Sequence, residues 1–221
     1  MSAHLLVIAK TPVPGRVKTR LCPPCTPEQA ALIATAALED TLDAVSATPA
    51  ARRTLVVEGS YRAPAGWNRV AQRGDGLGER LAHAFAVAGG PCLLVGMDTP
   101  QLTPALLTRV LAGLGRSQAV LAPACDGGWW ALALRDPTHA RVLAEVPMST
   151  SDTFVLTAAA LRGLGLTVHI GPELRDVDHA ADARAVASLC PGSRFAGAVA
   201  RHLPSTEPSA LPSARLAEAR S

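Results

Sequence analysis

"HLLVIAKTPVPGRVKTRL", residues 4–21, joins the two features that decide the fold. Its first six residues, 4–9, form an apolar run after the initial His4, which is typical of a parallel strand buried on both faces of a sheet. The loop that follows is rich in proline and basic residues and contains Lys10 and Lys18, the only lysines of the chain. Ligands of open α/β sheets bind at the carboxyl ends of the strands. The stretch therefore predicts a first strand that leads into a cationic, ligand-binding loop.

Segments typical of helices and strands alternate along the rest of the chain. Thr26, Pro27 and Gln29 form a helix-start pattern with a capping box, so a helix is predicted over 27–47. Further strands are predicted at 53–59, 91–98, 119–124, 128–134 and 166–171, a short strand and a helix within 69–90, and helices after residues 103, 149 and 179. This alternation predicts an α/β fold with a Rossmann-like, mostly parallel sheet and helices on both faces.

We expect residues 1–202 to form one domain and the Pro-, Ser- and Ala-rich residues 203–221 to be a disordered tail. A net charge of +3 and only 3% aromatic residues argue against a nucleic-acid binder. No apolar run reaches the roughly 18 residues of a membrane span. The odd count of five cysteines favours the cytoplasm, and Cys22 and Cys25 fit a proline-rich turn better than a metal or redox pair.

The cationic loop has the composition of a phosphate site. Gly15 allows close approach of the backbone, and the compact charges of Lys10 and Lys18 alternate with the bidentate forks of Arg16 and Arg20. The spacing matches neither a P-loop nor a dinucleotide fingerprint. A solvated basic loop is the alternative.

Two aspartates at predicted strand ends are candidate ligands of a divalent cation. Asp98 closes the strand 91–98, and Asp178 lies in the loop after 166–171, with Asp176 behind it. Magnesium takes one or two protein carboxylates and fills its shell with water and phosphate. Alternatively, Asp98 belongs to a turn and Asp178 caps the helix that follows.

The segment "DGGWWALAL", residues 126–134, combines a possible ligand contact with a turn signal. Asp126 could accept hydrogen bonds from ligand hydroxyls, and Gly127 and Gly128 would let a ligand approach the backbone. Asp-Gly is also a strong hairpin signal. Trp129 and Trp130 point to opposite faces of the strand, so one of them is expected in the core and the other at a surface or cleft.

Two further motifs carry weaker signals. In "GDGLGERL", residues 74–81, Gly78 belongs to a flexible turn and Arg80 opens a helix, where both could contact phosphates. Ser149 and Thr150 fit either helix caps or ligand contacts.

Six segments in this order resemble the radical-SAM/selenodomain-associated transferase family of the GT-A-like nucleotide-diphospho-sugar transferase superfamily. They are "AKTPVPGRVKTRL", "GDGLGERLAHAF", "LLVGMDTPQLTPALL", "DGGWWALAL", "MSTSDTF" and "DVDHAADA". The segment "VKTRL" is also similar to "AKSRL" of 2-phospholactate guanylyltransferase. Tryptophans stand where the family has "DGGYY", and Met148 replaces the tryptophan of its "WST", so Trp130 and Met148 would reshape the acceptor pocket.

The resemblance implies a GT-A-like fold with Mg²⁺ or Mn²⁺ on Asp98 and Asp178. It implies that Lys10, Arg16, Lys18 and Arg20 hold nucleotide phosphates, an assignment we extend to Gly15, Gly78 and Arg80. Acceptor or sugar contacts are expected from Asp126, Gly127, Gly128, Trp130, Ser149 and Thr150, and catalytic roles from Lys18, Asp98 and Asp126.

We therefore expect a transferase that moves a sugar from a nucleotide-diphospho-sugar to a small acceptor. Nucleotidyl transfer with release of pyrophosphate is the close alternative, and a non-catalytic nucleotide-binding protein is the third. The sequence leaves the base, the sugar, the acceptor and the oligomeric state open, with a homodimer among the alternatives.

Overall fold

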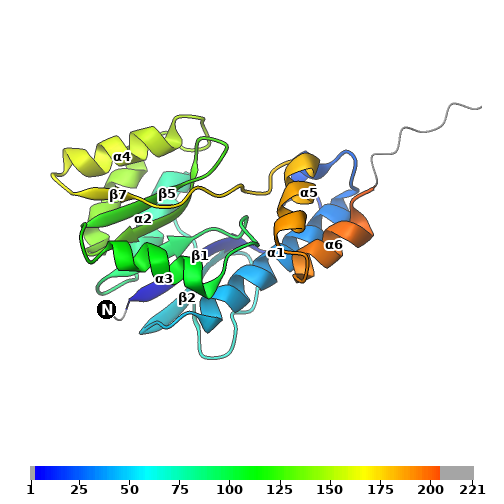
Figure 1. Cartoon of the computed structure of the whole chain (residues 1–221), viewed down its shortest axis with the longest axis horizontal. Coiled ribbons are helices and arrows are strands. Elements are labelled where there is room, and N and C mark those ends of the chain that lie inside the picture. Colours follow the sequence, from blue (N-terminus) through cyan, green and yellow to red (C-terminus); the bar gives the residue numbers. More distant parts are fainter. Residues whose placement is uncertain (1–2, 205–221) are drawn as a thin grey trace, which may run out of the picture.

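A seven-stranded sheet with the order β3-β2-β1-β4-β6-β5-β7 forms the centre of the computed structural model, which describes residues 3–204 (Figure 1). The strands are β1 (His4–Lys10), β2 (Arg52–Glu58), β3 (Asn68–Ala71), β4 (Cys92–Val95), β5 (Ala119–Pro123), β6 (Trp129–Leu134) and β7 (Val168–Ile170). Only β6 is antiparallel to its neighbours among these strands. The predicted α/β class and mostly parallel sheet are confirmed.

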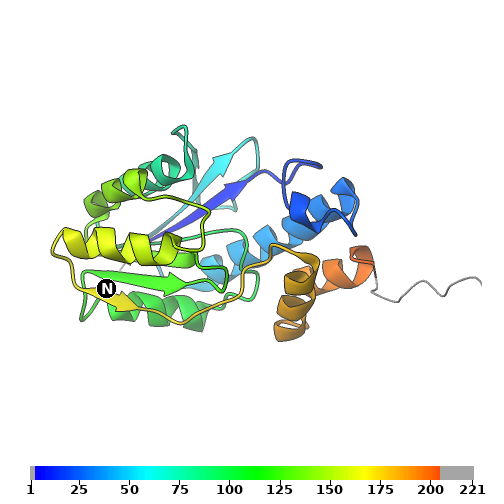
Figure 2. The ribbon, with the colours of Figure 1, turned by 90° about the horizontal axis from the view of Figure 1, so that it is seen from above.

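Helices cover both faces of the sheet (Figure 2). They are η1 (Thr19–Leu21), α1 (Pro27–Ala47), α2 (Leu77–Ala86), α3 (Pro104–Gly113), η2 (Pro137–Glu145), α4 (Thr153–Gly163), α5 (Ala180–Leu189) and α6 (Arg194–His202), of which η1 and η2 are 3₁₀-helices. Among the described residues, none of them is long and apolar enough to cross a bilayer.

The predicted capping box starts α1. Thr26 Oγ1 accepts a hydrogen bond from the Gln29 backbone N–H at 3.3 Å, and Gln29 Oε1 accepts one from the Thr26 N–H at 2.8 Å. Both bonds satisfy backbone donors that the first helical turn leaves without partners.

The uninterrupted apolar sequence of β1 has a direct cause in this arrangement. Leu5 and Val7 pack in the core under α1 and α3, whereas Leu6 packs on the other face with Leu81 and Phe85 of α2. A central parallel strand is buried on both faces, so alternation of apolar and polar residues is absent.

Helix α6 packs along α1, α5 packs on α6, and together they form a lobe beside the sheet (Figure 1). Phe195 and Ile33 are buried in its core together with Val177, from the segment that leads into α5. Leu203 is 8% exposed in the same core. The predicted tail therefore begins after Leu203 at the earliest, and its residues 205–221 lie outside the described residues.

Candidate functional site

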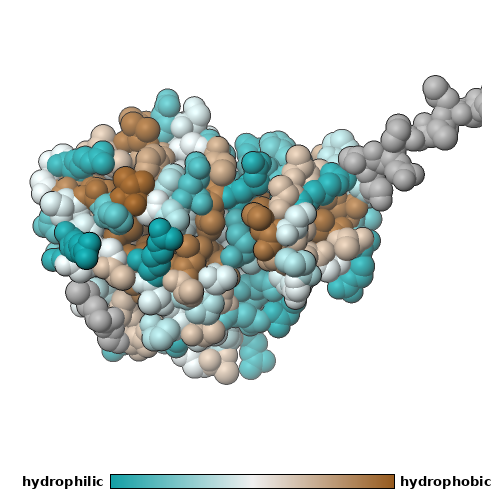
Figure 3. All heavy atoms as spheres, in the orientation of Figure 1, coloured by the Kyte–Doolittle hydropathy of each residue, from teal (hydrophilic) through white to brown (hydrophobic). Residues whose placement is uncertain are grey.

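The loops that follow the parallel strands meet at one edge of the sheet. Strands β1, β2, β3, β4, β5 and β7 all run in the same direction, so the loops after them lie at a common carboxyl edge. These loops contain the cationic stretch, "GDGLGERL", Asp98, "DGG" and the segment with Asp176 and Asp178. The segment between β7 and α5 runs along this edge to the lobe (Figure 1). Figure 3 shows hydrophilic side chains between the sheet and the lobe.

An ionic cluster of Lys18, Asp98 and Asp178 lies at this edge. The Lys18 Nζ is 2.7 Å from Asp98 Oδ1 and 3.6 Å from Asp178 Oδ1. The side chain of Lys18 is only 8% exposed, compared with 47% for Asp98 and 30% for Asp178. The predicted cation and the two predicted metal ligands are therefore in direct contact, although about 80 residues of sequence separate each from the next.

Two hydrogen bonds to the Val177 backbone hold the three loops of the cluster together. Lys18 Nζ also donates to the Val177 carbonyl, and the Val177 N–H donates to the Asp98 carbonyl at 2.9 Å. Lys18 itself has a left-handed backbone, with φ 47°. A non-glycine residue in this region needs support from its surroundings, which the cluster supplies.

Asp178 forms ion pairs with Arg20 and Lys18 and does not cap α5. Its Oδ2 lies 2.5 Å from Arg20 Nη1, whereas the helix begins after His179, whose N–H donates to Asp182 Oδ2 at 2.9 Å. The capping alternative for Asp178 is therefore wrong, because Asp182 serves the helix start.

Charges in the cluster influence one another. Burial of Lys18 opposes its charge, but the carboxylates of Asp98, Asp178 and Asp176 outweigh burial and raise the pKa of Lys18. Burial, and then the nearby Asp126 charge, raise the pKa of Asp176 to about 6. The edge thus gathers three carboxylates around one buried ammonium, with Asp126 near one of them, Asp176. Such a group of carboxylates attracts further positive charge.

The carboxylates of Asp98 and Asp178 have the right chemistry for a hard divalent cation. Within residues 3–204 no group of three or more His, Cys, Asp or Glu side chains is arranged to hold a metal. Magnesium, however, needs only one or two protein carboxylates when substrate phosphates and water complete its shell. Both carboxylates already contact a single cationic atom, the Lys18 Nζ, which acts as a stand-in ion. The donor set therefore fits a phosphate-bound metal.

Lys10 and Arg80 form a second, more exposed cluster around Glu58. The Glu58 Oε2 lies 2.6 Å from Arg80 Nη1 and 3.7 Å from Lys10 Nζ, and Arg80 Nε donates to the Gly74 carbonyl at 3.0 Å. Sequence reasoning missed Glu58, although it is the last residue of β2 and pairs in register with Lys10. Gly15 and Arg16 are exposed in the loop between β1 and η1, and Gly15 has a positive φ of 74°.

Gly78 was wrongly predicted as a phosphate contact. It is buried where α2 packs against η2, and a Cβ there would lie 2.2 Å from the Leu143 carbonyl oxygen. Glycine is needed at this point for the close approach of two backbones.

The segment "DGG" forms the hairpin between β5 and β6, as its turn alternative predicted. Gly127 has φ 89°, and a Cβ there would lie 2.1 Å from the Ser151 carbonyl oxygen. Asp126 is exposed, and its Oδ1 accepts a hydrogen bond from the Gly128 N–H at 2.7 Å. The hairpin and the loop before α4 are thus packed together, which brings two of the predicted ligand-binding motifs into contact.

Trp130 was also wrongly predicted, as a contact of the acceptor or sugar. It is 3% exposed in the core below α1 and α3, and its indole N–H donates to the Pro172 carbonyl at 2.9 Å, so its ring does not face a ligand. Trp129 is the half-buried partner on the other face. Ser149 and Thr150 are both exposed, and Thr150 is hydrogen-bonded to the start of α4 through its own backbone.

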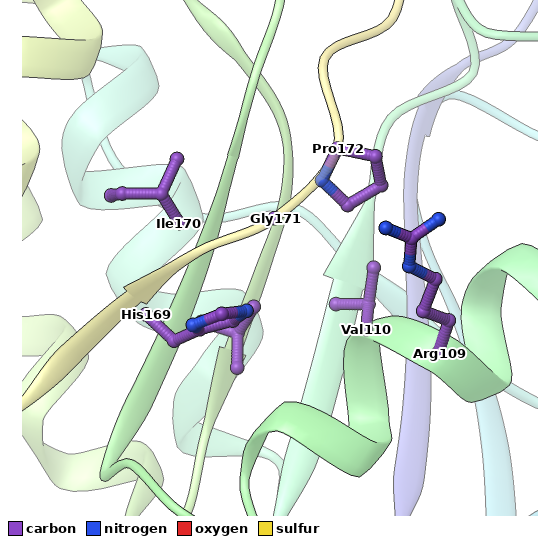
Figure 4. Close-up of a pocket in the computed structure, with 7 residues that line it drawn as sticks. Arg109, Val110, His169, Ile170, Gly171 and Pro172 are labelled. Carbon is purple, nitrogen blue, oxygen red and sulfur yellow. The ribbon is translucent and has the colours of Figure 1, made fainter.

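A hollow of about 220 Å³ lies beside the edge strand β7, and none of the predicted site residues lines it. Its wall includes Arg109, His169 and Pro172. Arg109 extends from α3 toward Pro172, at the start of the segment that leads to the ionic cluster (Figure 4). The hollow is therefore separate from the predicted site.

Comparison with known proteins gives a family match over more than half of the chain. The family model described as "Uncharacterized protein conserved in bacteria (DUF2064)" matches residues 31–150. Among curated protein sequences, none matches significantly.

Solved structures share the fold. A proposed nucleotide-diphospho-sugar transferase from Desulfovibrio desulfuricans superposes with a TM-score of 0.80 at 24% identity, covering 91% of this chain and 95% of that chain. CMP:2-keto-3-deoxy-manno-octonic acid synthetase gives 0.56 at 12% identity, covering 86% and 99%. The 2-C-methyl-D-erythritol 4-phosphate cytidylyltransferase from Thermus thermophilus gives 0.53 at 17% identity, covering 91% and 98%. At these identities the likeness establishes the GT-A-like fold alone.

Proposed function

The chain belongs to the DUF2064 family, and we propose that it is a metal-dependent transferase that acts on a nucleotide-activated donor. The observation that carries the proposal is the contact of Lys18 with Asp98 and Asp178 at the carboxyl edge of the sheet. Such an edge is where α/β sheets bind nucleotides, and carboxylates beside cations are what a metal-bound polyphosphate requires.

Asp98 and Asp178 would hold Mg²⁺ or Mn²⁺, which neutralises charge on the donor phosphates. Lys18 and Arg20 lie beside these carboxylates, and Lys10, Arg16 and Arg80 offer further positive charge along the same edge. These cations would stabilise the charge of the leaving phosphate.

Asp126 stands apart from the cations, at the hairpin beside the loop before α4. It is exposed, and with Gly127 and Gly128 it could accept and orient hydroxyl groups of the sugar or acceptor. Ser149 and Thr150 are exposed on the neighbouring loop and would complete that subsite.

Transfer of a sugar from a nucleotide-diphospho-sugar is the preferred reaction. It is supported by the higher TM-score with the proposed nucleotide-diphospho-sugar transferase, 0.80, and by the motifs that resemble the radical-SAM/selenodomain-associated transferases. Nucleotidyl transfer is the second candidate, because two structures of the same fold are a cytidylyltransferase and a CMP-sugar synthetase. The cysteine count keeps the cytoplasm as the predicted location.

The two reactions differ in the leaving group. Each nucleoside triphosphate and each nucleotide sugar is incubated with the protein, Mn²⁺ and mixtures of small hydroxylated or phosphorylated acceptors. Release of a nucleoside diphosphate from a nucleotide sugar is expected. Release of pyrophosphate from a triphosphate would identify nucleotidyl transfer, and nucleotide binding without either product would favour a non-catalytic role.

A further inference from the structure

Lys18 is placed where it would block the cation site that its neighbours form. We propose that the Lys18 ammonium is an internal counter-ion, which holds Asp98 and Asp178 together and which a divalent cation must displace in order to bind. This inference rests on the proposed function. It adds that the nucleotide regulates metal binding. The carboxylates of Asp98 and Asp178 become available to the metal when donor phosphates draw Lys18 away.

The geometry distinguishes Lys18 from an ordinary surface ion pair. Its side chain is 8% exposed and contacts Asp98, Asp178 and the Val177 carbonyl at once. Exposed pairs contribute little to stability, but a buried ammonium requires close partners to offset the loss of hydration. Lys18 is therefore held at a defined position between the carboxylates.

Lys18 and a divalent cation would compete for the same oxygen atoms. Asp98 Oδ1 is 2.7 Å from the ammonium, and magnesium binds carboxylate oxygens at about 2.0–2.1 Å. Two cations this close to one oxygen repel each other strongly, because Coulomb energy grows as the separation falls. One of them must leave, and the lysine side chain is the flexible partner.

Donor phosphates can supply the alternative partner for Lys18. An ammonium pairs readily with phosphate, and the surrounding loop already carries Arg16 and Arg20 near the same edge. If phosphates displace Lys18 in this way, the protein without nucleotide binds metal weakly, and the nucleotide and the metal bind together. The cluster would then prevent occupation of the site by metal alone.

Lys10 provides a matched control for the test. It is the other lysine of the chain and ends β1, just before the loop of Lys18, but it is 54% exposed and pairs with Glu58 at 3.7 Å. Lys10→Met removes the same charge from the edge of the sheet without freeing Asp98 or Asp178. Any effect of total charge on metal affinity will therefore appear in both variants.

The proposal is tested by measuring how tightly the full chain binds Mn²⁺ in the absence of nucleotide. Electron paramagnetic resonance reports the concentration of free Mn²⁺ in this titration. Lys18→Met is expected to bind Mn²⁺ at least about tenfold more tightly than the unaltered protein, and Lys10→Met to stay within about twofold. Adding Asp98→Asn to Lys18→Met should abolish the gain. Unchanged or weaker Mn²⁺ binding by Lys18→Met would overturn the proposal.

A second measurement uses the unaltered protein and does not depend on the folding of a variant. An amine-reactive ester labels lysines, and mass spectrometry separates the labelled peptides of Lys10 and Lys18. Labelling of Lys18 is expected to rise several-fold when Mn²⁺ is added, while labelling of Lys10 stays constant. Persistent protection of Lys18 at saturating Mn²⁺ would equally overturn the proposal.

Failure of this inference can be told from failure of the proposed function. If a nucleotide donor is turned over but Lys18→Met gains no Mn²⁺ affinity, only the counter-ion role is wrong. If Lys18→Met gains affinity but no nucleotide binds to the unaltered protein, the cation site stands and the transferase function is wrong.

Discussion

Asp98→Asn is the substitution to which the ionic cluster should respond most directly. The Asp98 carboxylate lies 2.7 Å from the Lys18 ammonium, which is almost fully buried. At this separation two unit charges interact with roughly 1.5 kcal/mol at the dielectric constant of water and about 6 kcal/mol at an effective value of 20. Asp98 is 47% exposed, and asparagine still accepts a hydrogen bond, so the free energy of unfolding is expected to fall by about 2 kcal/mol.

Urea and thermal unfolding measure this loss, which corresponds to about 4–8 °C in Tm for a protein of this size. Asp75→Asn is the control, because Asp75 is exposed at the same edge and outside the cluster. The enhancement of nucleotide affinity by Mn²⁺ should also disappear in Asp98→Asn, since a hard cation needs the lost charge. An Asp98→Asn protein that unfolds like the control and keeps its metal dependence would refute the reasoning.

Three further changes test the neighbourhood of the site. Gly78→Ala should lower the free energy of unfolding by about 1–3 kcal/mol, because its Cβ would lie 2.2 Å from a carbonyl of η2, and calorimetry should find nucleotide affinity unchanged in the folded variant. Burial and Asp126 raise the pKa of Asp176 from its ordinary value of 3.8 to about 6. The folded state therefore holds this proton more tightly than the unfolded state. As a result, the free energy of unfolding falls as pH rises from 3.8 to about 6. Asp176→Asn should therefore gain about 1 kcal/mol in urea unfolding above that window, after allowance for solvent screening, and less below it. Removal of residues 205–221 should leave Tm and assembly size unchanged, because the buried Leu203 is retained; a drop of several degrees would contradict this.

Much of the fold was predictable because local signals agreed with the tertiary structure. The capping box at Thr26 and the apolar strand 4–9 both appear where the sequence places them. Helix α6 was missed, although Ser193 supplied an N-cap signal: its Oγ accepts a hydrogen bond from the Ala196 N–H at 2.9 Å. Strand order could not be predicted, because it depends on which crossovers pack, and periodicity carries no information about that.

The site was predictable only at the level of loops. Parallel strands bring their carboxyl ends to one edge, so the sequence could place Lys18, Asp98 and Asp178 near one another. The sequence could not predict that Lys18 pairs with both aspartates. This pairing depends on side-chain conformations and on the Val177 backbone, which joins two of the loops. The alternation of a strand likewise cannot tell which of its two covered faces is buried more deeply, and for that reason Trp130 was wrongly predicted to contact a ligand.

The same pairing explains why position 18 carries a lysine in a chain whose other basic residues, apart from Lys10, are arginines. Lys18 fits a buried position between two carboxylates as a compact charge, whereas the wider, planar guanidinium of arginine suits the more exposed pairs that Arg20 and Arg80 make. A single ammonium on a flexible stem can also leave its partners when phosphates arrive, which a bidentate fork does less readily. Lys18→Arg should therefore keep the positive charge yet bind nucleotide and Mn²⁺ together less tightly than the unaltered protein. Equal affinity of the two proteins in a titration of nucleotide at saturating Mn²⁺ would mean that charge alone, and not the shape of the ammonium, determines the choice of lysine.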